Sequence, residues 1–206
     1  MNQPLARQAT AGSPVAPLLT VRGLSVEFVT RRGSSRALDR VSFDMAPGEI
    51  LGLVGESGAG KSLSGNAIIG LIDPPGHVVE GEIAFEGKRI DNLPPNQMRK
   101  LRGRRIAAIF QDPLTSLDPL MRIGDQITET ILTHLPMSQA AARARALDLL
   151  KAVGIPAPDV RIDHYPHQFS GGMRQRVVIA LAVCADPKLM QRLSDGLSAE
   201  RIDRLL

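Results

Sequence analysis

The stretch with the clearest chemical capacity is rich in glycine and ends in a lysine and a hydroxyl residue. Its residues are Gly55, Glu56, Ser57, Gly58, Ala59, Gly60, Lys61 and Ser62. Glycine, four residues, glycine, lysine and serine is the pattern of the P-loop. The glycines let successive backbone N–H groups point at phosphate oxygens, and a following helix adds its positive N-terminal end. The stretch predicts a phosphate-binding loop.

The residues around this loop favour that interpretation over an ordinary glycine turn. The mostly apolar run from Glu49 to Val54 predicts a strand before the loop, and Leu63, Ala67, Ile68 and Leu71 recur with helical spacing after it. In such a loop Lys61 faces the β- and γ-phosphates of a nucleotide, and the Ser62 hydroxyl is a ligand of Mg²⁺.

Two further segments carry polar groups at the ends of predicted elements. Ser170, Gly171 and Gly172 precede a long apolar run and predict a helix from about Gly171 to Ala185, capped by Ser170. Alone, this sequence is an ordinary helix cap. The apolar run from Ile106 to Phe110 predicts a buried strand that ends at Gln111.

Together these segments resemble the nucleotide-binding subunits of ABC transporters. The stretches FQDPLTSLDP and YPHQFSGGMRQRV are similar to the branch that imports dipeptides, oligopeptides and nickel. The resemblance makes Gln111 the Q-loop residue, facing Mg²⁺ and the attacking water. It makes Ser170, Gly171 and Gly172 the signature motif, which contacts ATP held by the P-loop of a facing subunit.

One aromatic residue also matches the family. Phe28 lies in the first predicted strand, at the position that stacks on adenine in these subunits. An aromatic residue on a strand is also typical of a hydrophobic core, so both interpretations remain open.

The resemblance implies an α/β fold of the P-loop NTPase class, with a RecA-like core, an antiparallel β subdomain and an inserted helical subdomain at about residues 112–170. A length of 206 residues with 43% apolar content suits one such domain. We expect a flexible leader at residues 1–17, the nucleotide-binding domain at 18–190 and a tail unlike the family at 191–206.

The family match stops at Met190, before the Walker B Asp-Glu, the D-loop and the switch histidine. Gln191 and the residues after it are too polar for the buried strand that the family has there, and Asp195 is no substitute. We therefore expect a truncated fold that lacks two central strands. The runs 50–54 and 106–110 would then lack hydrogen-bonding neighbours, and the chain would be marginally stable.

The implied activity is the coupling of MgATP binding and hydrolysis to import of peptides or nickel at the cytoplasmic face of the inner membrane. The implied partners are a second ATPase subunit arranged head to tail, two membrane-spanning permease subunits and, indirectly, an extracytoplasmic substrate-binding protein. One alternative is a non-catalytic fragment that binds nucleotide at most. Another is a soluble ABC protein that acts on DNA or ribosomes.

Composition narrows these alternatives. The net charge is +4 and residues 99–105 are strongly basic. However, the chain has one Tyr, no Trp and five Phe, which offer no stacking surface for single-stranded nucleic acid. We therefore expect no nucleic-acid partner. The sequence predicts neither a transmembrane helix nor a secretory signal. Cys184 is the only cysteine, which excludes an internal disulfide and predicts a small buried hydrophobic residue.

Overall fold

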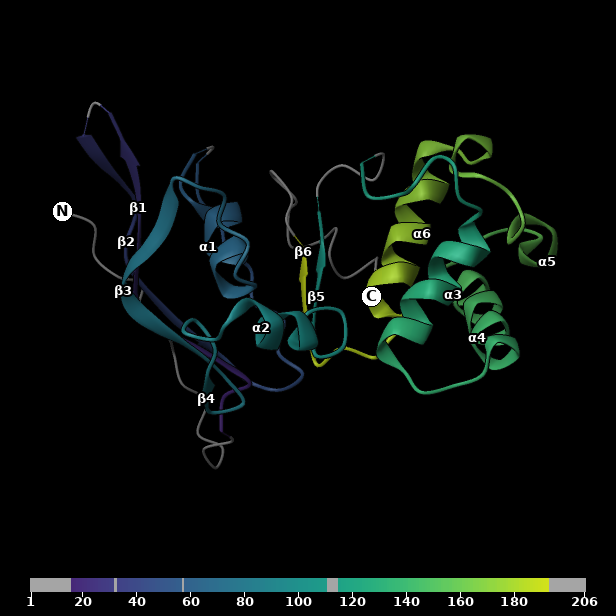
Figure 1. Cartoon of the computed structure of the whole chain (residues 1–206), viewed down its shortest axis with the longest axis horizontal. Helices are drawn as coiled ribbons and strands as arrows, with labels where there is room; N and C mark the ends of the chain where they lie inside the picture. The colour runs from purple at the N-terminus through teal and green to yellow at the C-terminus, as the bar shows by residue number, and fades with distance from the viewer. Residues whose placement is uncertain (1–15, 32, 57, 111–114, 193–206) are drawn as a thin grey trace.

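The first half of the chain builds an antiparallel sheet. The computed structural model describes residues 16–31, 33–56, 58–110 and 115–192. The sheet has four strands in the order β2-β1-β3-β4 (Figure 1). Their bounds are β1 Leu19–Thr30, β2 Gly33–Met45, β3 Gly76–Phe85 and β4 Lys88–Arg89. The predicted antiparallel sheet is confirmed, and β3 begins earlier than its apolar residues indicate.

A second, parallel sheet has two strands, β5 (Ile106–Ile109) and β6 (Leu189–Arg192). Ile106 lies opposite Leu189, and Ile109 opposite Arg192. Two predictions are therefore wrong: the 106–110 run has a neighbour, and the chain continues as a strand past Met190. The physical reason is that backbone groups form the ladder, so a polar side chain such as that of Gln191 does not prevent pairing.

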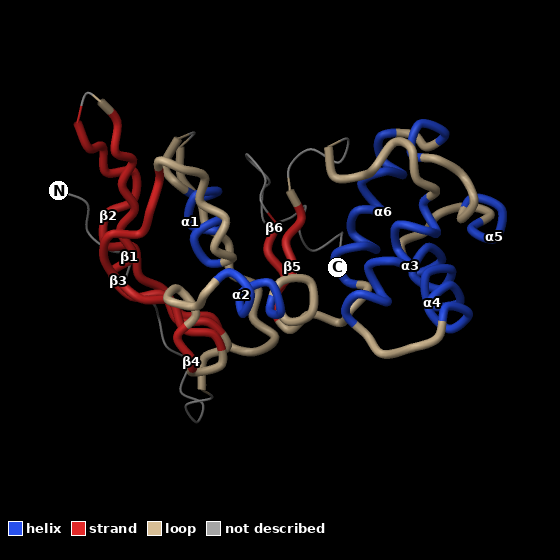
Figure 2. Tube along the Cα trace, viewed as in Figure 1, coloured by secondary structure: helices blue, strands red, loops and turns tan. Residues whose placement is uncertain are grey.

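The predicted strand from Glu49 to Val54 is also wrong. The structure has no strand over these residues, and they join β2 to the next helix as an irregular segment, drawn as loop in Figure 2. Ile50 is 59% exposed and Val54 is 88% exposed. A strand needs a neighbour to satisfy its N–H and C=O groups, and no described strand pairs with this segment.

The helices fall into two groups. Two lie beside the antiparallel sheet: α1 (Lys61–Ile68) and α2 (Pro95–Leu101). The others form a bundle in the second half: α3 Ile123–His134, α4 Gln139–Ala152, α5 Pro158–Arg161, the 3₁₀ helix η1 Pro166–Gln168, and α6 Gly171–Val183. Ser138 is the N-cap of α4, and its hydroxyl accepts a hydrogen bond from the Ala141 N–H at 3.2 Å.

Two hydrophobic cores follow this division, and β5 and β6 lie between them (Figure 1). Ile106 and Leu189 pack into the core under the antiparallel sheet. Ile109 and Cys184 pack into the core of the helical bundle. Burial raises the pKa of the Cys184 thiol to about 11, so this cysteine is the buried hydrophobic residue that the sequence predicts.

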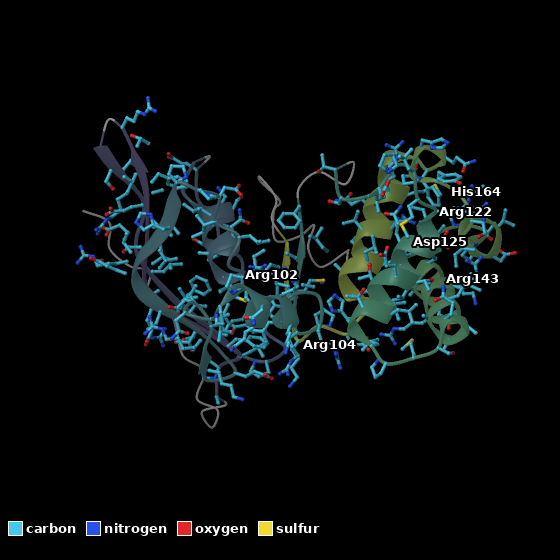
Figure 3. The ribbon with its side chains drawn as sticks, viewed as in Figure 1. Arg102, Arg104, Arg122, Asp125, Arg143 and His164 are labelled. Carbon is cyan, nitrogen blue, oxygen red and sulfur yellow. The ribbon has the colours of Figure 1, made fainter. Side chains whose placement is uncertain are left out.

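Charged side chains tie β5 and β6 to the elements around them. Glu86, in the turn between β3 and β4, pairs with Arg105 and with Lys188, whose Nζ lies 2.6 Å from its carboxylate. Arg104 donates to the Ala185 carbonyl oxygen at 2.8 Å. Arg102 donates to the carbonyl oxygens of Ile69 and Gly70 at the end of α1, both at 2.6 Å (Figure 3). Three arginines of the basic run thus bind within the chain.

A pH dependence of stability follows from His134, which ends α3 and packs against Gly103. Burial, and then the charge of Arg104, lower the pKa of His134 below its ordinary 6.5. The folded state therefore favours neutral His134. The resulting contribution to the free energy of unfolding is present above the pKa that His134 has in the unfolded chain. It is lost as pH falls through the lower pKa of the folded chain. Between about pH 7.5 and about pH 5, the free energy of unfolding should fall further in the parent chain than in His134→Gln.

Urea unfolding at both pH values measures this difference. His167→Gln is the matched control, because His167 is exposed and should leave the parent's pH dependence intact. Parallel pH profiles for the parent and His134→Gln would show that His134 makes no such contribution.

Candidate functional site

Two glycines of the glycine-rich loop have a backbone conformation that favours glycine. Gly58 and Gly60 both have φ of +83°, in the left-handed region that glycine tolerates best. Gly60 is the N-cap residue of α1 and lies against β2, where an added Cβ would overlap the Leu38 side chain. The loop therefore packs on the antiparallel sheet through a position that only glycine can fill.

The side chain of Lys61 folds back onto the loop and bonds to its backbone. Its Nζ donates to the carbonyl oxygens of Gly55 at 2.9 Å and Glu56 at 2.8 Å. The ammonium group is thus held at the mouth of the loop, where it can exchange these neutral acceptors for phosphate oxygens, which bind it more strongly. The first turn of α1 contains no acidic residue, so the positive end of the helix is not neutralised.

Other loop residues surround this ammonium group. Gly55, Glu56 and Ala59 are exposed, and Ser62 follows Lys61 with its side chain at the surface. Ser57 lies outside the described residues. An exposed glycine-rich turn with one ammonium and one hydroxyl at the start of a helix is suited to a bound phosphate chain.

Phe28 lies on the sheet near the loop. Val26, two residues earlier on β1, pairs with Leu38, which lies under Gly60. Alternate residues share a sheet face, so Phe28 follows Val26 by about 7 Å along that face. Its ring is half-buried against Gly76, where an added Cβ would approach within 2.7 Å. This position suits either stacking on a base or packing in the core, and the adenine role stays a prediction.

The signature segment is a second helix start. Ser170 is the N-cap of α6, and its hydroxyl accepts from the Met173 N–H at 3.4 Å. Ser170, Gly171 and Gly172 are exposed, and a Cβ added at either glycine would meet nothing within 4 Å. Packing within the chain therefore does not require glycine at these two positions. Glycine here leaves the start of the helix open to close approach by another molecule.

Arg174 holds this segment in place. Its Nε donates to the carbonyl oxygens of Pro166 at 2.9 Å and Phe169 at 3.0 Å, while Phe169 is buried in the helical core. The side chain of Arg174 thus fixes the turn that precedes α6 and contains Ser170. The sequence does not predict this role of Arg174. The position of an arginine on a helix does not indicate which carbonyl groups the fold brings near it.

The loop before the signature is anchored on α3. The N–H groups of Ile123 and Gly124 donate to the carbonyl oxygens of His164 at 2.9 Å and Ile162 at 2.7 Å. Nη2 of Arg143, on α4, contacts both carboxylate oxygens of Asp163 in the same loop at 2.9 Å. Figure 3 shows Arg122, Asp125, Arg143 and His164 together at this end of the helices. The signature is therefore built on helical elements and the P-loop on the sheet.

The chain does not bring its two phosphate-binding candidates together. α1 lies beside the antiparallel sheet and α6 in the helical bundle, with β5 and β6 between them (Figure 1). Gln111 follows β5 and falls outside the described residues. Among the described residues no cluster of three or more His, Cys, Asp or Glu could hold a metal ion. Within the same ranges, no helix is long and apolar enough to cross a bilayer.

Comparison with known proteins identifies the family. The profile described as ABC transporter matches residues 38–191, which is more than half of the chain. The chain belongs to the ABC transporter family. The predicted P-loop at residues 55–62 and the predicted signature at 170–172 both lie within the matched region.

Two curated relatives show how much of a longer protein this chain matches. It is 50% identical over 177 residues to the oligopeptide transport ATP-binding protein OppD of Bacillus subtilis, and 49% identical over 173 residues to the dipeptide transport ATP-binding protein DppD of Escherichia coli. These alignments cover 85% and 84% of this chain but 49% and 53% of the relatives. The chain spans about half the length of the curated relatives it matches.

Solved structures confirm the fold class. The dimeric ATP-binding cassette MJ0796 bound to ADP and Pi is similar with a TM-score of 0.76 and 26% identity, over 91% of this chain and 80% of that one. The protein cbiO1 from Clostridium perfringens, part of the ABC transporter complex cbiONQ, has a TM-score of 0.71 at 24% identity, over 92% of this chain and 72% of that one. The chain has the P-loop NTPase fold of ABC cassettes, as predicted.

Replacement of the P-loop lysine tests the first phosphate site. Lys61→Ala should weaken ATP binding by about 10- to 100-fold, because the one ammonium group at the mouth of the loop is lost. Isothermal titration or fluorescent nucleotide binding measures the affinity. Lys88→Ala, an exposed lysine on β4, is the matched control and should bind as the parent does. An affinity for Lys61→Ala within about twofold of the parent would remove the P-loop assignment.

Replacement of the aromatic residue separates its two interpretations. If Phe28 stacks on adenine, Phe28→Ala should weaken ATP by about 5- to 100-fold and leave inorganic triphosphate binding unchanged, since stacking acts on the base alone. Val29→Ala changes the next, exposed residue and should affect neither ligand. Equal losses for ATP and triphosphate would show that Phe28 belongs to the core.

Proposed function

We propose that this chain is the ATP-binding subunit of an ABC importer, which couples MgATP binding and hydrolysis to uptake of peptides or nickel. The observation that carries the proposal is the Lys61 ammonium, held at the mouth of a glycine loop that opens at the start of α1. The relatives' names support peptides as the transported class, since they are oligopeptide and dipeptide transport ATP-binding proteins.

Ser62 and Gln111 are the residues that we propose for Mg²⁺. Ser62 fits, because its exposed hydroxyl follows Lys61 at the start of α1. Few protein ligands suffice, since protein-bound Mg²⁺ takes most of its oxygen ligands from phosphates and water. When bound, the ion neutralises charge that develops on the phosphates during transfer. Lys61 and the loop N–H groups orient the same phosphates from the other side.

The signature segment supports an assembly of two subunits. Ser170, Gly171 and Gly172 lie away from the P-loop of their own chain, so we propose that they serve the nucleotide of a second ATPase subunit in a head-to-tail dimer. We further propose two membrane-spanning permease subunits, an extracytoplasmic binding protein that acts through them, and a peripheral location on the cytoplasmic face of the inner membrane. Residues 18–190 would form the nucleotide-binding domain, with a helical subdomain at about 112–170.

A second candidate function is nucleotide binding without turnover. It is favoured by β6, which occupies the position of a strand that in the family ends in Asp-Glu but here ends in Gln191 and Arg192. A missing general base costs about 10²- to 10⁴-fold in rate. The basic run is the only feature that favours action on DNA or ribosomes, and Arg102, Arg104 and Arg105 of that run bind carbonyl and carboxylate groups within the chain.

ATP turnover by the purified chain distinguishes the two functions. We expect the chain to bind ATP and to hydrolyse it at least about 100-fold more slowly than a fusion in which residues 191–206 give way to the matching second half of the Escherichia coli relative. The Lys61→Ala version of that fusion is the control and should be inactive. Turnover of about 1 s⁻¹ or more by the unfused chain would contradict the second candidate, because that is an ordinary enzyme rate.

A further inference from the structure

The helix that follows the glycine-rich loop is held at its far end by a residue from another part of the chain. α1 has 8 residues and no basic residue in its last turn. A helix of this length is marginal alone, and the carbonyl groups at its end need partners from elsewhere. Arg102, at the end of α2, donates to the carbonyl oxygens of Ile69 and Gly70, both at 2.6 Å (Figure 3). Its guanidinium group also places a positive charge at the negative end of the helix.

The backbone at the end of α1 admits this guanidinium group. Gly70 has a φ of +63°, and its N–H donates to the Ala67 carbonyl oxygen at 3.1 Å. The Leu71 N–H donates to the Asn66 carbonyl oxygen at 2.8 Å, which completes a Schellman motif. A Cβ added at Gly70 would lie 3.1 Å from Nη2 of Arg102. The motif satisfies the earlier carbonyl groups of the helix end, and Arg102 binds two later ones.

The backbone of Arg102 is itself fixed by two other elements. Its N–H donates to the Met98 carbonyl oxygen of α2 at 3.1 Å. Arg102 also forms an isolated parallel bridge with Ile106, the first residue of β5, and the Gly103 N–H donates to the Ile106 carbonyl oxygen at 2.8 Å. The side chain of Arg102 therefore connects the end of α1 to α2 and to the start of β5.

We propose that Arg102 is a positioning residue for the phosphate site. It holds the far end of α1, so that the helix start with Lys61 and Ser62 keeps the position in which it binds phosphate. This inference rests on the proposed ATP-binding function. The other end of α1 is held by the packing of Gly60 on Leu38 of β2. With Arg102 in place, the helix is held at both ends.

The expected effect comes from the position of the helix and not from direct attraction between charges. The residues of α1 span about 12 Å. That length exceeds the Debye length of about 8 Å at physiological salt, so the guanidinium group attracts a phosphate at the opposite end of the helix only weakly. A displaced helix start has to be restored when phosphate binds, and this lowers the apparent affinity.

Isothermal titration with MgATP and with inorganic triphosphate tests the proposal. Arg102→Gln should weaken both ligands by a similar factor, about 3- to 10-fold, because the change acts on the phosphate site and not on the base. Arg102→Lys keeps the charge but lacks the planar fork that reaches both carbonyl groups. Its affinity for each ligand should lie between those of Arg102→Gln and the parent chain.

Arg104→Gln is the matched control. Arg104 lies in the same turn and donates to the Ala185 carbonyl oxygen, beyond the end of α6, at 2.8 Å. Its replacement should lower the free energy of unfolding much as the replacement of Arg102 does, yet leave the affinity for both ligands within about twofold of the parent. Urea unfolding measures the stability of each variant and shows that it is folded.

The outcomes separate this inference from the proposed function. A folded Arg102→Gln chain that binds both ligands as the parent does overturns the inference, and Arg102→Lys decides in the same way if Arg102→Gln does not fold. A loss confined to MgATP overturns it too. An equal loss in Arg104→Gln also overturns it, because lowered stability alone would then explain the effect. A parent chain that binds neither ligand contradicts the proposed function itself, and the inference with it.

Discussion

The parallel pairing of β5 with β6 is the interaction on which the rest of this chain depends. It joins residues 106–109 to 189–192, and the two strands contribute side chains to both hydrophobic cores. The two strands lie between the antiparallel sheet, which carries the predicted P-loop, and the helical bundle, which carries the predicted signature. Glu86, bound by Arg105 and Lys188, holds the same junction from the side of the sheet.

The two helix starts that we propose bind phosphate, those of α1 and α6, lie in different parts of the molecule. α1 begins at a loop moulded to the antiparallel sheet through Gly60, whereas α6 begins at a turn fixed by Arg174 and by the contacts of residues 162–164 with α3. Each start is held by its own core.

Local features of this fold could be predicted from the sequence. The cap at Ser170 and the antiparallel pairing of β1 with β2 each depend on residues close together in the chain. The errors concern partners far apart in sequence. Residues 50–54 and 106–109 have similar apolar runs, yet among the residues that the structure describes only the second has a neighbouring strand, and that strand is the polar-ended β6. The roles of Arg102 and Arg174 were equally hidden, since their carbonyl partners are brought near only by the fold.

The central claim, that one chain carries two phosphate-binding helix starts that serve different nucleotides, is tested most directly by hydrogen exchange with and without MgATP in dilute solution. The account predicts slower exchange at the backbone amides of residues 58–62 and no change at residues 171–173, because the signature lacks a facing P-loop in a dilute sample. Protection of both segments together at dilutions where the chain is monomeric would contradict it, as would protection of neither.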